Sequence, residues 1–298
     1  MMNRAIRRAV VTALVAIVAP SAAVLAGPIP LGETGSFSLT RVQQLKDGAG
    51  GEFTVYDVKT LAGTPSTTVT NASYSDSPAT LNVLSSYGDP LGTPILGSFQ
   101  TFCLEMSEDA LLVDSNFFVV GSAAAAGGKG VVSGRDPLSK GSAWLYSQFA
   151  QGLLNVTPVT GNAAGNYFAA GAPTRSTEAG NLQRAIWWLE HEGLPALETK
   201  ELNPYYMAAW NFFGGELNAM ADADEGEYGV YVLNNFKTKN ALDTFLATND
   251  IFAVNRTDRA QDFLYYQKDV SVPDGGMTAM LLGGALVTLG ALRRKRSR

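Results

Sequence analysis

The chain of 298 residues contains one cysteine, Cys103, and one histidine, His191. A single cysteine excludes an intramolecular disulfide, although cysteines of proteins in oxidising compartments normally pair. One cysteine and one histidine also cannot supply the usual ligands of a zinc site. No glycine-rich segment has the spacing of a phosphate-binding loop. We therefore expect no cofactor, and Cys103 needs an explanation other than a disulfide or zinc.

Positive charge is also scarce. The 22 Lys and Arg residues are outnumbered by 27 Asp and Glu residues, which gives a formal net charge of −5. Several of the cations lie at the two ends of the chain, so the middle is more acidic than the whole. Because phosphate contacts need cations, we expect no nucleic-acid partner. The acidity favours solubility instead.

The C-terminal end contains a polar motif, an apolar run from Met277 to Leu292 and a basic cluster from Arg293 to Arg296. Basic segments resist translocation and stay in the cytoplasm. The apolar run is shorter than the roughly 20 residues that a stable helical span prefers, which suits a segment held briefly in the membrane. The motif that precedes the run consists of Val272, Pro273, Asp274, Gly275 and Gly276.

This arrangement resembles the PEP-CTERM family of sorting signals, in its VPDGG/VPDSG variant, over residues 272–298. Such signals are read by exosortase, a transpeptidase-like membrane enzyme of Gram-negative bacteria. The resemblance implies an exosortase-type partner, a transient stay in the inner membrane, and delivery to the cell surface or the extracellular matrix.

The N-terminal end has the features of a secretory signal peptide. Arg4, Arg7 and Arg8 precede an apolar stretch from Ala9 to Ala26, and Gly27 follows small residues. A charged segment, an apolar segment and a small-residue cleavage site define such a signal, so we expect export by the secretion machinery. The expected organisation is a signal peptide over 1–26, a single extracytoplasmic domain over 27–271 and the sorting signal over 272–298.

Between these ends, β-rich runs come first, helical patterns follow, and strands return. Runs of strands, then helices, then strands are typical of α+β proteins. We expect an antiparallel sheet or sandwich with a central helical insertion, flanked by the signal peptide and the C-terminal transmembrane sorting helix. The segment around Cys103 alternates like a half-buried strand. The predicted strands are Ser36–Val42, Glu52–Thr60, Ala79–Ser86, Ser98–Met106, Asn116–Gly121, Tyr228–Asn234 and Asp262–Val270, and the predicted helices are Ser139–Leu154, Ser176–Glu192, Pro204–Phe213 and Asn240–Thr248.

Two short motifs stand out within this domain. Phe102-Cys103-Leu104 lies in a predicted strand, and Gln183-Arg184-Ala185-Ile186-Trp187 lies in a predicted helix further along the chain. Together they resemble the thioester domains of bacterial surface adhesins, in which a cysteine thiol and a glutamine side chain condense into an internal thioester. The resemblance implies that Cys103 is the thiol donor and Gln183 the acyl donor. Leu182 stands where that family usually has threonine.

The chemistry explains the residue types. An amide is a poor acyl donor, so the thiol must be held against it, and only the thiolate attacks. Water would hydrolyse the product unless it is excluded, which is the shielding role we expect for Phe102, Trp187 and Trp188. An extracellular target with an amine or hydroxyl would displace Cys103. The protein would then be a single-use covalent adhesin rather than a turnover enzyme.

Simpler interpretations stay open. A strand cysteine is often a small core residue, and the same fold without the bond would be a structural, carbohydrate-contacting or biofilm-matrix protein. Gln148 is a rival acyl donor, because it also stands two residues before an alanine. A further alternative is a Cys–His hydrolase, with Cys103 as nucleophile, His191 as base, and Glu190 or Glu192 as the orienting carboxylate.

One acidic segment has oxygen ligands of the kind that Ca²⁺ prefers. Asp222, Asp224 and Glu227 surround a glycine there, but the segment lacks the full spacing of a calcium loop. We therefore expect a solvated acidic turn and predict no metal site.

Overall fold

The computed structural model describes residues 31–47, 50–60, 99–106, 108–112, 116–125, 135–156, 167, 172–192 and 199–267. The expected signal peptide, the predicted strand at 79–86 and the expected sorting signal lie outside the described residues. Within these ranges, no helix combines the length and the apolar composition that crossing a membrane requires.

Six antiparallel strands form the main sheet, in the order β3-β2-β1-β4-β7-β8. Leu39 of β1 stands opposite Val55 of β2, and Val120 of β4 opposite Leu233 of β7. A small ribbon of β5 (Ala123–Ala124) and β6 (Asp136–Pro137) lies beside it. The six strands are β1 (Thr34–Asp47), β2 (Gly50–Thr60), β3 (Phe99–Thr101), β4 (Asn116–Gly121), β7 (Val230–Phe236) and β8 (Phe263–Tyr266).

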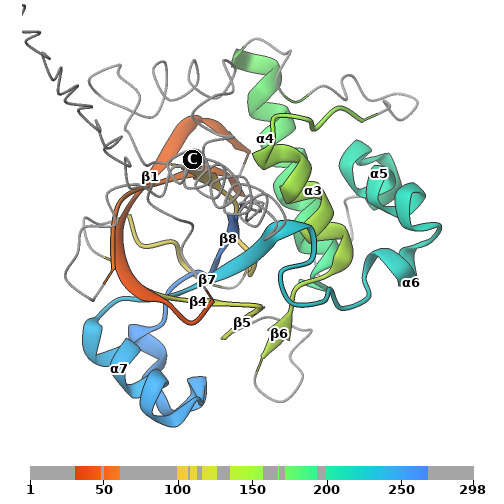
Figure 1. Ribbon diagram of the computed structural model, residues 1–298. Coiled ribbons are helices and arrows are strands. Elements are labelled where there is room, and N and C mark those ends of the chain that lie inside the picture. Colours follow the sequence, from red (N-terminus) through yellow and green to blue (C-terminus); the bar gives the residue numbers. More distant parts are fainter. Residues whose placement is uncertain are drawn as a thin grey trace, which may run out of the picture.

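The two end strands of this sheet meet, so the sheet is nearly closed (Figure 1). The Thr101 hydroxyl donates to the Leu264 carbonyl at 2.6 Å. Cys103 then forms a β-bridge with Phe263, and the Leu104 amide donates to the Asp262 carbonyl at 3.1 Å. The α+β class is thus confirmed, and the described antiparallel strands curl into one nearly closed sheet.

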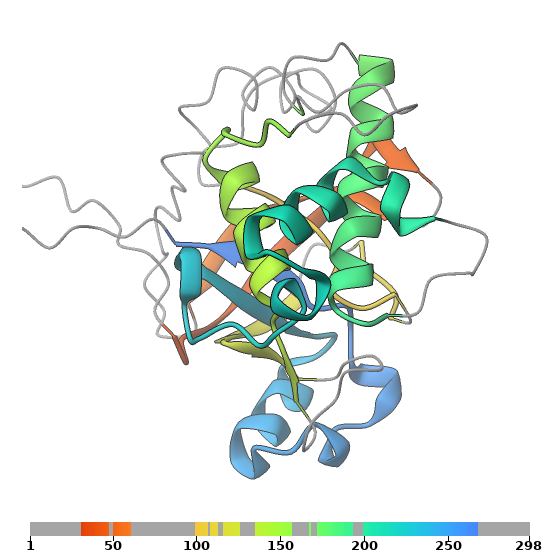
Figure 2. The same cartoon turned by 90° about the vertical axis from the view of Figure 1, so that its right-hand side faces the viewer.

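Helices α3 to α6 come between β6 and β7, where the sequence predicts a central helical insertion, and α7 (Lys239–Thr248) follows β7. Helices α3 (Lys140–Ala150) and α4 (Ala172–Leu189) pack against the curled sheet, and α5 (Pro204–Phe213) and α6 (Glu216–Ala219) lie outside them (Figures 1 and 2). The 3-10 turns η2 (Lys200–Leu202) and η3 (Glu227–Gly229) flank α5 and α6. The apolar stripe of α4 is fully buried, as its spacing predicts: Leu182, Ala185, Ile186 and Leu189.

Helix ends follow local capping rules in part. The Asn203 side chain accepts from the amides of Tyr205 and Tyr206 and starts α5, and Gly214 ends it with φ 72°, because a left-handed cap suits glycine. The bounds predicted for α5 are confirmed. The start predicted for α4 was wrong: the helix begins at Ala172, and Pro173 suits a first turn.

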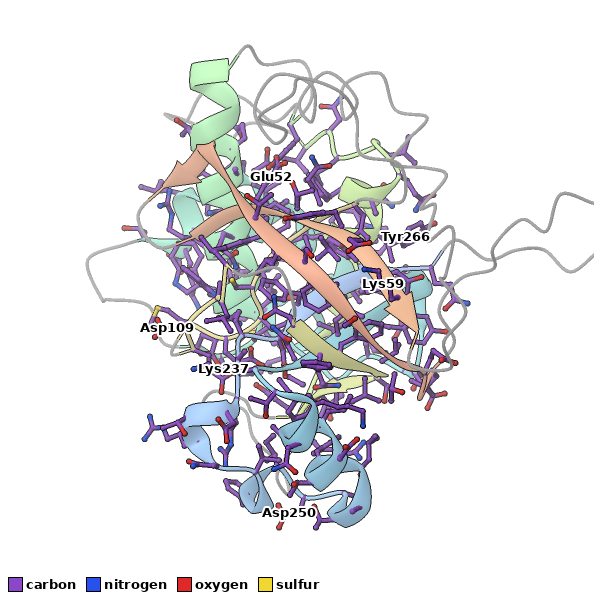
Figure 3. The ribbon with its side chains drawn as sticks, turned by 90° about the vertical axis from the view of Figure 1, so that its left-hand side faces the viewer. Glu52, Lys59, Asp109, Lys237, Asp250 and Tyr266 are labelled. Carbon is purple, nitrogen blue, oxygen red and sulfur yellow. The ribbon has the colours of Figure 1, made fainter. Side chains whose placement is uncertain are left out.

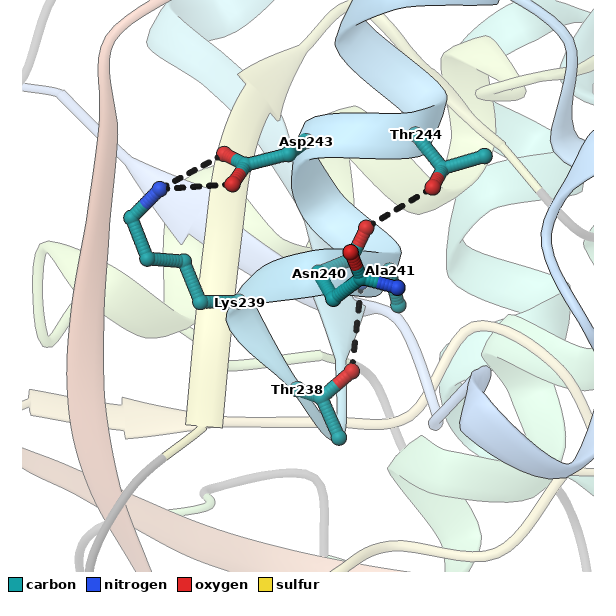
Figure 4. Close-up of polar contacts among 6 residues, drawn as sticks. All are labelled: Thr238, Lys239, Asn240, Ala241, Asp243 and Thr244. Carbon is teal, nitrogen blue, oxygen red and sulfur yellow. Dashed lines mark hydrogen bonds and ion pairs between the residues drawn. The ribbon is translucent and has the colours of Figure 1, made fainter.

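A second, smaller core lies at the far end of the sheet, under α7 (Lys239–Thr248) and the turns η4 (Ile251–Ala253) and η5 (Arg256–Asp258). The Thr238 hydroxyl caps α7 by accepting from the Ala241 amide at 3.2 Å (Figure 4). Lys239 pairs with Asp243 one turn along, at 2.7 Å. This second core contains Val119, Ala125, Phe236, Ala241, Leu242, Phe245, Ile251 and Val254.

The segment that carries Cys103 differs from its prediction. β3 ends at Thr101, and every residue from Phe99 to Glu105 is buried, so the expected half-buried strand was wrong. One cause is closure of the sheet edge against β8. The other is α3, whose Phe149 ring lies 5.0 Å from the Phe102 ring. Alternation of apolar and polar residues marks a strand that has one exposed face, and it does not mark a strand that is covered on both faces.

Candidate functional site

Cys103 and Gln183, 80 residues apart in the chain, meet at the junction of β3 and α4. The bridge to Phe263 fixes the backbone of Cys103. The buried stripe of α4 fixes the rotation of that helix and so directs Gln183 toward the sheet. The exposed fraction is 0% for Gln183 and 4% for Cys103. The two residues form a contact inside the core.

The contact is a reciprocal pair of hydrogen bonds. The Cys103 amide donates to Gln183 Oε1 at 3.0 Å, and Gln183 Nε2 donates to the Cys103 carbonyl at 2.8 Å. Both polar ends of the buried side chain are therefore satisfied by one residue, as burial demands. The amide plane of Gln183 is fixed alongside the backbone of Cys103. Gln148, the rival acyl donor, is partly exposed on α3.

Gly50, at the start of β2, packs against the side chains of Gln183 and Trp187. A Cβ atom on Gly50 would lie 2.3 Å from Cγ of Gln183 and 3.0 Å from Cη2 of Trp187. The first of these contacts is shorter than carbon atoms allow in well-packed interiors, and the second is tight. The absence of a side chain at Gly50 therefore lets the strand lie directly against the Gln183 side chain.

The three expected shielding residues lie in different places. Trp187, 6% exposed, lines the same pocket as Cys103. Phe102 is fully buried and packs edge-to-face on Phe149. The ring of Trp188 lies 6.0 Å from that of Tyr206, in the contact between α4 and α5. Only Trp187 of the three lines the described pocket.

The pocket beside Cys103 has a volume of about 230 Å³ and an acidic lining. Glu105, Glu108 and Asp109 line it together with Cys103 and Trp187. Asp109 is exposed and marks the outer side in Figure 3. Cys103 thus lines a small cavity together with three residues that have carboxyl groups.

Two of these carboxyl groups have strongly perturbed proton affinity. Burial, reinforced by the neighbouring Asp262 and Glu108 carboxylates, raises the pKa of Glu105 well above its usual value. Burial and Asp262 raise the pKa of Glu108 to about 8. Asp262 accepts from the amides of Asn235 and Ala125, at 2.7 and 3.1 Å.

The sequence interpretation missed this acidic pocket. Glu105 stands two residues after Cys103 in an otherwise apolar run, which is a signal that was available. Its partner Gln261, which donates to Glu105 Oε2 at 2.7 Å, is 156 residues away. Glu192 lies beyond the end of α4 and accepts from the Met106 amide at 3.0 Å. These long-range pairings leave no local pattern.

The residues of the hydrolase alternative are not gathered at Cys103. His191 is exposed, with φ 61° after α4, and does not line the described Cys103 pocket. The Glu190 carboxylate accepts from the amide and the hydroxyl of Ser139, at 3.1 and 2.7 Å. The Glu192 carboxylate accepts from the Met106 amide. This placement gives no support to a Cys–His pair.

The acidic segment folds back on itself. The Glu227 carboxylate accepts from the Asp224 amide at 2.9 Å, around Gly226 with φ 68°. Asp222 forms a β-bridge with Ser139. Among the described residues, no group of three or more histidine, cysteine or acidic side chains is arranged to hold a metal ion.

The geometry brings a thiol-bearing residue and a side-chain amide together in a region shielded from solvent, beside a pocket that a small nucleophile can enter. Proximity of this kind is what acyl transfer between two weakly reactive groups requires. Comparison of the chain with protein-family models, with curated proteins and with solved structures finds no match.

Proposed function

We propose that this chain is an exported surface or matrix protein that attaches covalently to an extracellular target through a thioester between Cys103 and Gln183. The observation that carries the proposal is the reciprocal hydrogen-bond pair between the two residues. The protein would act once per molecule, as an adhesin, and not as a turnover enzyme. Its targets would carry amines or hydroxyls.

Formation of the bond is an acyl transfer without redox change. The Cys103 sulfur attacks Cδ of Gln183, the Sγ–Cδ bond forms, and the Cδ–Nε2 bond breaks. The thiol proton ends on the departing nitrogen, which leaves as ammonia. The burial of both residues supports this step, because the fixed geometry replaces an encounter in solution.

The Cys103 amide has a second role in this reaction. It donates to Gln183 Oε1 at 3.0 Å, and this oxygen is the atom that becomes negatively charged when sulfur attacks. A preorganised donor at that position stabilises the tetrahedral intermediate, as an oxyanion hole does. The residue that supplies the nucleophile thus also polarises the acyl group.

The second step delivers the protein to its target. A target amine or hydroxyl attacks Cδ, the Sγ–Cδ bond breaks, and Cys103 regains a thiol. The new amide or ester joins the target to Gln183. Trp187 and Gly50 cover the acyl group and limit access of water, which would otherwise hydrolyse it.

The terminal segments supply the location of this chemistry. A signal peptide over 1–26 would direct the chain to the secretion machinery, and the single domain over 27–271 would act outside the cytoplasm. An exosortase-type enzyme would process the transmembrane sorting signal over 272–298 in the inner membrane. Surface or matrix delivery then places the reactive domain where targets occur.

Methylamine, a minimal amine target, tests the proposal. We expect the full chain to incorporate it at Gln183 as a methylamide, while Cys103 becomes alkylatable in the same reaction. Peptide mapping locates both changes, and Gln148 is the internal control. Free alkylation of Cys103 without methylamine, with an unmodified Gln183, would contradict the proposal.

One alternative has an observation of its own. Because both polar ends of Gln183 are satisfied by backbone groups, the residue could serve only to tie α4 to β3. The chain would then be a non-catalytic structural or biofilm-matrix protein. In that case Cys103→Ser leaves the mass of Gln183-containing peptides and all binding to amine-bearing surfaces unchanged.

A further inference from the structure

Three residues that line the pocket beside Cys103 each have a buried polar atom without a hydrogen-bond partner among the described residues: Oε1 of Glu105, Oε2 of Glu108 and Nε1 of Trp187. Glu105 is 1% exposed and Trp187 is 6% exposed. Leaving such groups unpaired costs stability, so native proteins rarely do it without a functional reason. These carboxyl and indole groups therefore have hydrogen-bonding capacity left for a ligand.

Glu105 is held in place through its other oxygen. Oε2 accepts from Gln261 Nε2 at 2.7 Å and from the Asp262 amide at 3.3 Å. Oε1 belongs to a side chain that lines the same cavity as Cys103, two residues earlier in the chain. The carboxyl group is thus oriented by one oxygen and left reactive at the other.

Among the described residues, the charged groups that shift the pKa of Glu105 are the acidic Asp262, Glu108 and Glu192. Arg259 and Lys237 act on Glu108 instead. Burial and these acidic groups raise the pKa of Glu105 well above its usual value, which favours the protonated, neutral form of the side chain. A neutral carboxyl group can give a proton to one atom and take one from another.

Resting on the proposed thioester, we propose that Glu105 is the proton shuttle of this pocket. In the opening step the target nitrogen bonds to Cδ of Gln183, and the departing Cys103 sulfur takes the Glu105 proton. The resulting carboxylate then takes a proton from the new nitrogen–carbon adduct. The products are an amide, a Cys103 thiol and a restored Glu105 acid, so atoms and charge balance.

Formation of the thioester uses the same group in reverse. The Glu105 acid protonates Nε2 so that ammonia can leave, and the resulting carboxylate takes the proton of the Cys103 thiol as the Sγ–Cδ bond forms, which restores the acid. An amide nitrogen leaves poorly without a proton, which makes an acid necessary at this point. A cavity of about 230 Å³ has room for a small nucleophile and for a water molecule that could pass the proton.

The test compares Glu105→Gln, which keeps the size of the side chain and its acceptor oxygen, with the unchanged full chain. We expect the methylamine reaction to be slowed by about 10²-fold or more. We also expect its pH profile, between about pH 5 and about pH 9, to lose an inflection. Glu201→Gln, which removes an exposed carboxylate outside the pocket, is the matched control and should react at the unchanged rate.

Glu108→Gln provides a second readout if Glu105→Gln folds poorly. Removing the Glu108 charge lowers the pKa of Glu105, so the inflection should move to lower pH. An unshifted profile in Glu108→Gln, or a wild-type rate in folded Glu105→Gln, overturns the shuttle. Absence of the thioester in the unchanged chain, seen first by its mass, would instead overturn the proposed function.

Discussion

The α7 end and the Cys103 pocket satisfy their polar groups in opposite ways. At the α7 end the partners are near neighbours in sequence: Thr238 caps Ala241, and Asp250 caps Phe252. In the pocket the partners are distant, with Gln183 80 residues from Cys103 and Gln261 156 residues from Glu105. Local rules thus build one region, and the folded topology builds the other.

The two regions also differ in what they leave unpaired. Glu105 and Trp187 each keep a buried atom without a partner, among the described residues, whereas the caps of α7 are paired. Real proteins break local rules mainly at functional sites. The difference supports placing the chemistry at the pocket and a purely stabilising role at α7.

The largest effect is expected from Gln183→Ala. This change removes the partner of both backbone groups of Cys103 and leaves a cavity, so the free energy of unfolding should fall by about 3 kcal/mol. Denaturant unfolding measures it, with the partly exposed Gln148→Ala as control at under about 0.5 kcal/mol. Equal effects in both variants would remove the distinction between the two glutamines.

Gly50→Ala should come next. The added methyl group overlaps Cγ of Gln183, so the strand or the side chain must shift, at about 1–3 kcal/mol. Because the shift separates Gln183 from Cys103, the fraction of chains with the bond should also fall. The peptide masses of the purified variant give that fraction. An unchanged fraction would show that close approach of Gly50 is not required.

The stability of the protein should also depend on pH through buried carboxyl groups, and not through the α7 end. Burial raises the pKa of Glu108 to about 8 and that of Glu190 to about 7. The folded state therefore holds more protons than the unfolded state between the ordinary glutamate pKa and these values, so stability should fall as pH rises through this window. Thermal unfolding at a series of pH values tests this. Glu108→Gln should flatten the slope, whereas Asp243→Asn on α7 should leave it unchanged.

The smallest effect is expected at α7. Thr238→Ala removes the cap on the Ala241 amide and should cost about 1 kcal/mol of unfolding free energy. The same variant should retain the full reactivity toward methylamine, since α7 does not line the pocket. Loss of reactivity in Thr238→Ala would show that the two regions are coupled.

The sequence predicts the parts of the fold that obey short-range rules. β4 begins and ends where expected, and α5 has the predicted bounds because Asn203 and Gly214 are strong caps. The predicted start of α4 at Ser176 was wrong, because the helix begins at Ala172, and Glu178 is a buried residue in its interior. Its carboxylate accepts from the Tyr205 hydroxyl at 2.5 Å.

Short-range rules do not predict the closure of the sheet or the acidic pocket. The bridge between Cys103 and Phe263 joins segments on either side of the whole helical insertion. Covering of both faces hides the alternation that would mark the strand. The pairing of Cys103 with Gln183 was expected from the resemblance of two motifs to a known family, and no spacing rule gives their contact.

Intact mass of the full chain is the most direct measurement of the proposed bond. We expect the unchanged chain to be lighter, by one ammonia, than its processed sequence requires, and Cys103→Ser to have the full mass of its own sequence. A full mass in both chains, with the thiol of Cys103 open to alkylation, would contradict the thioester.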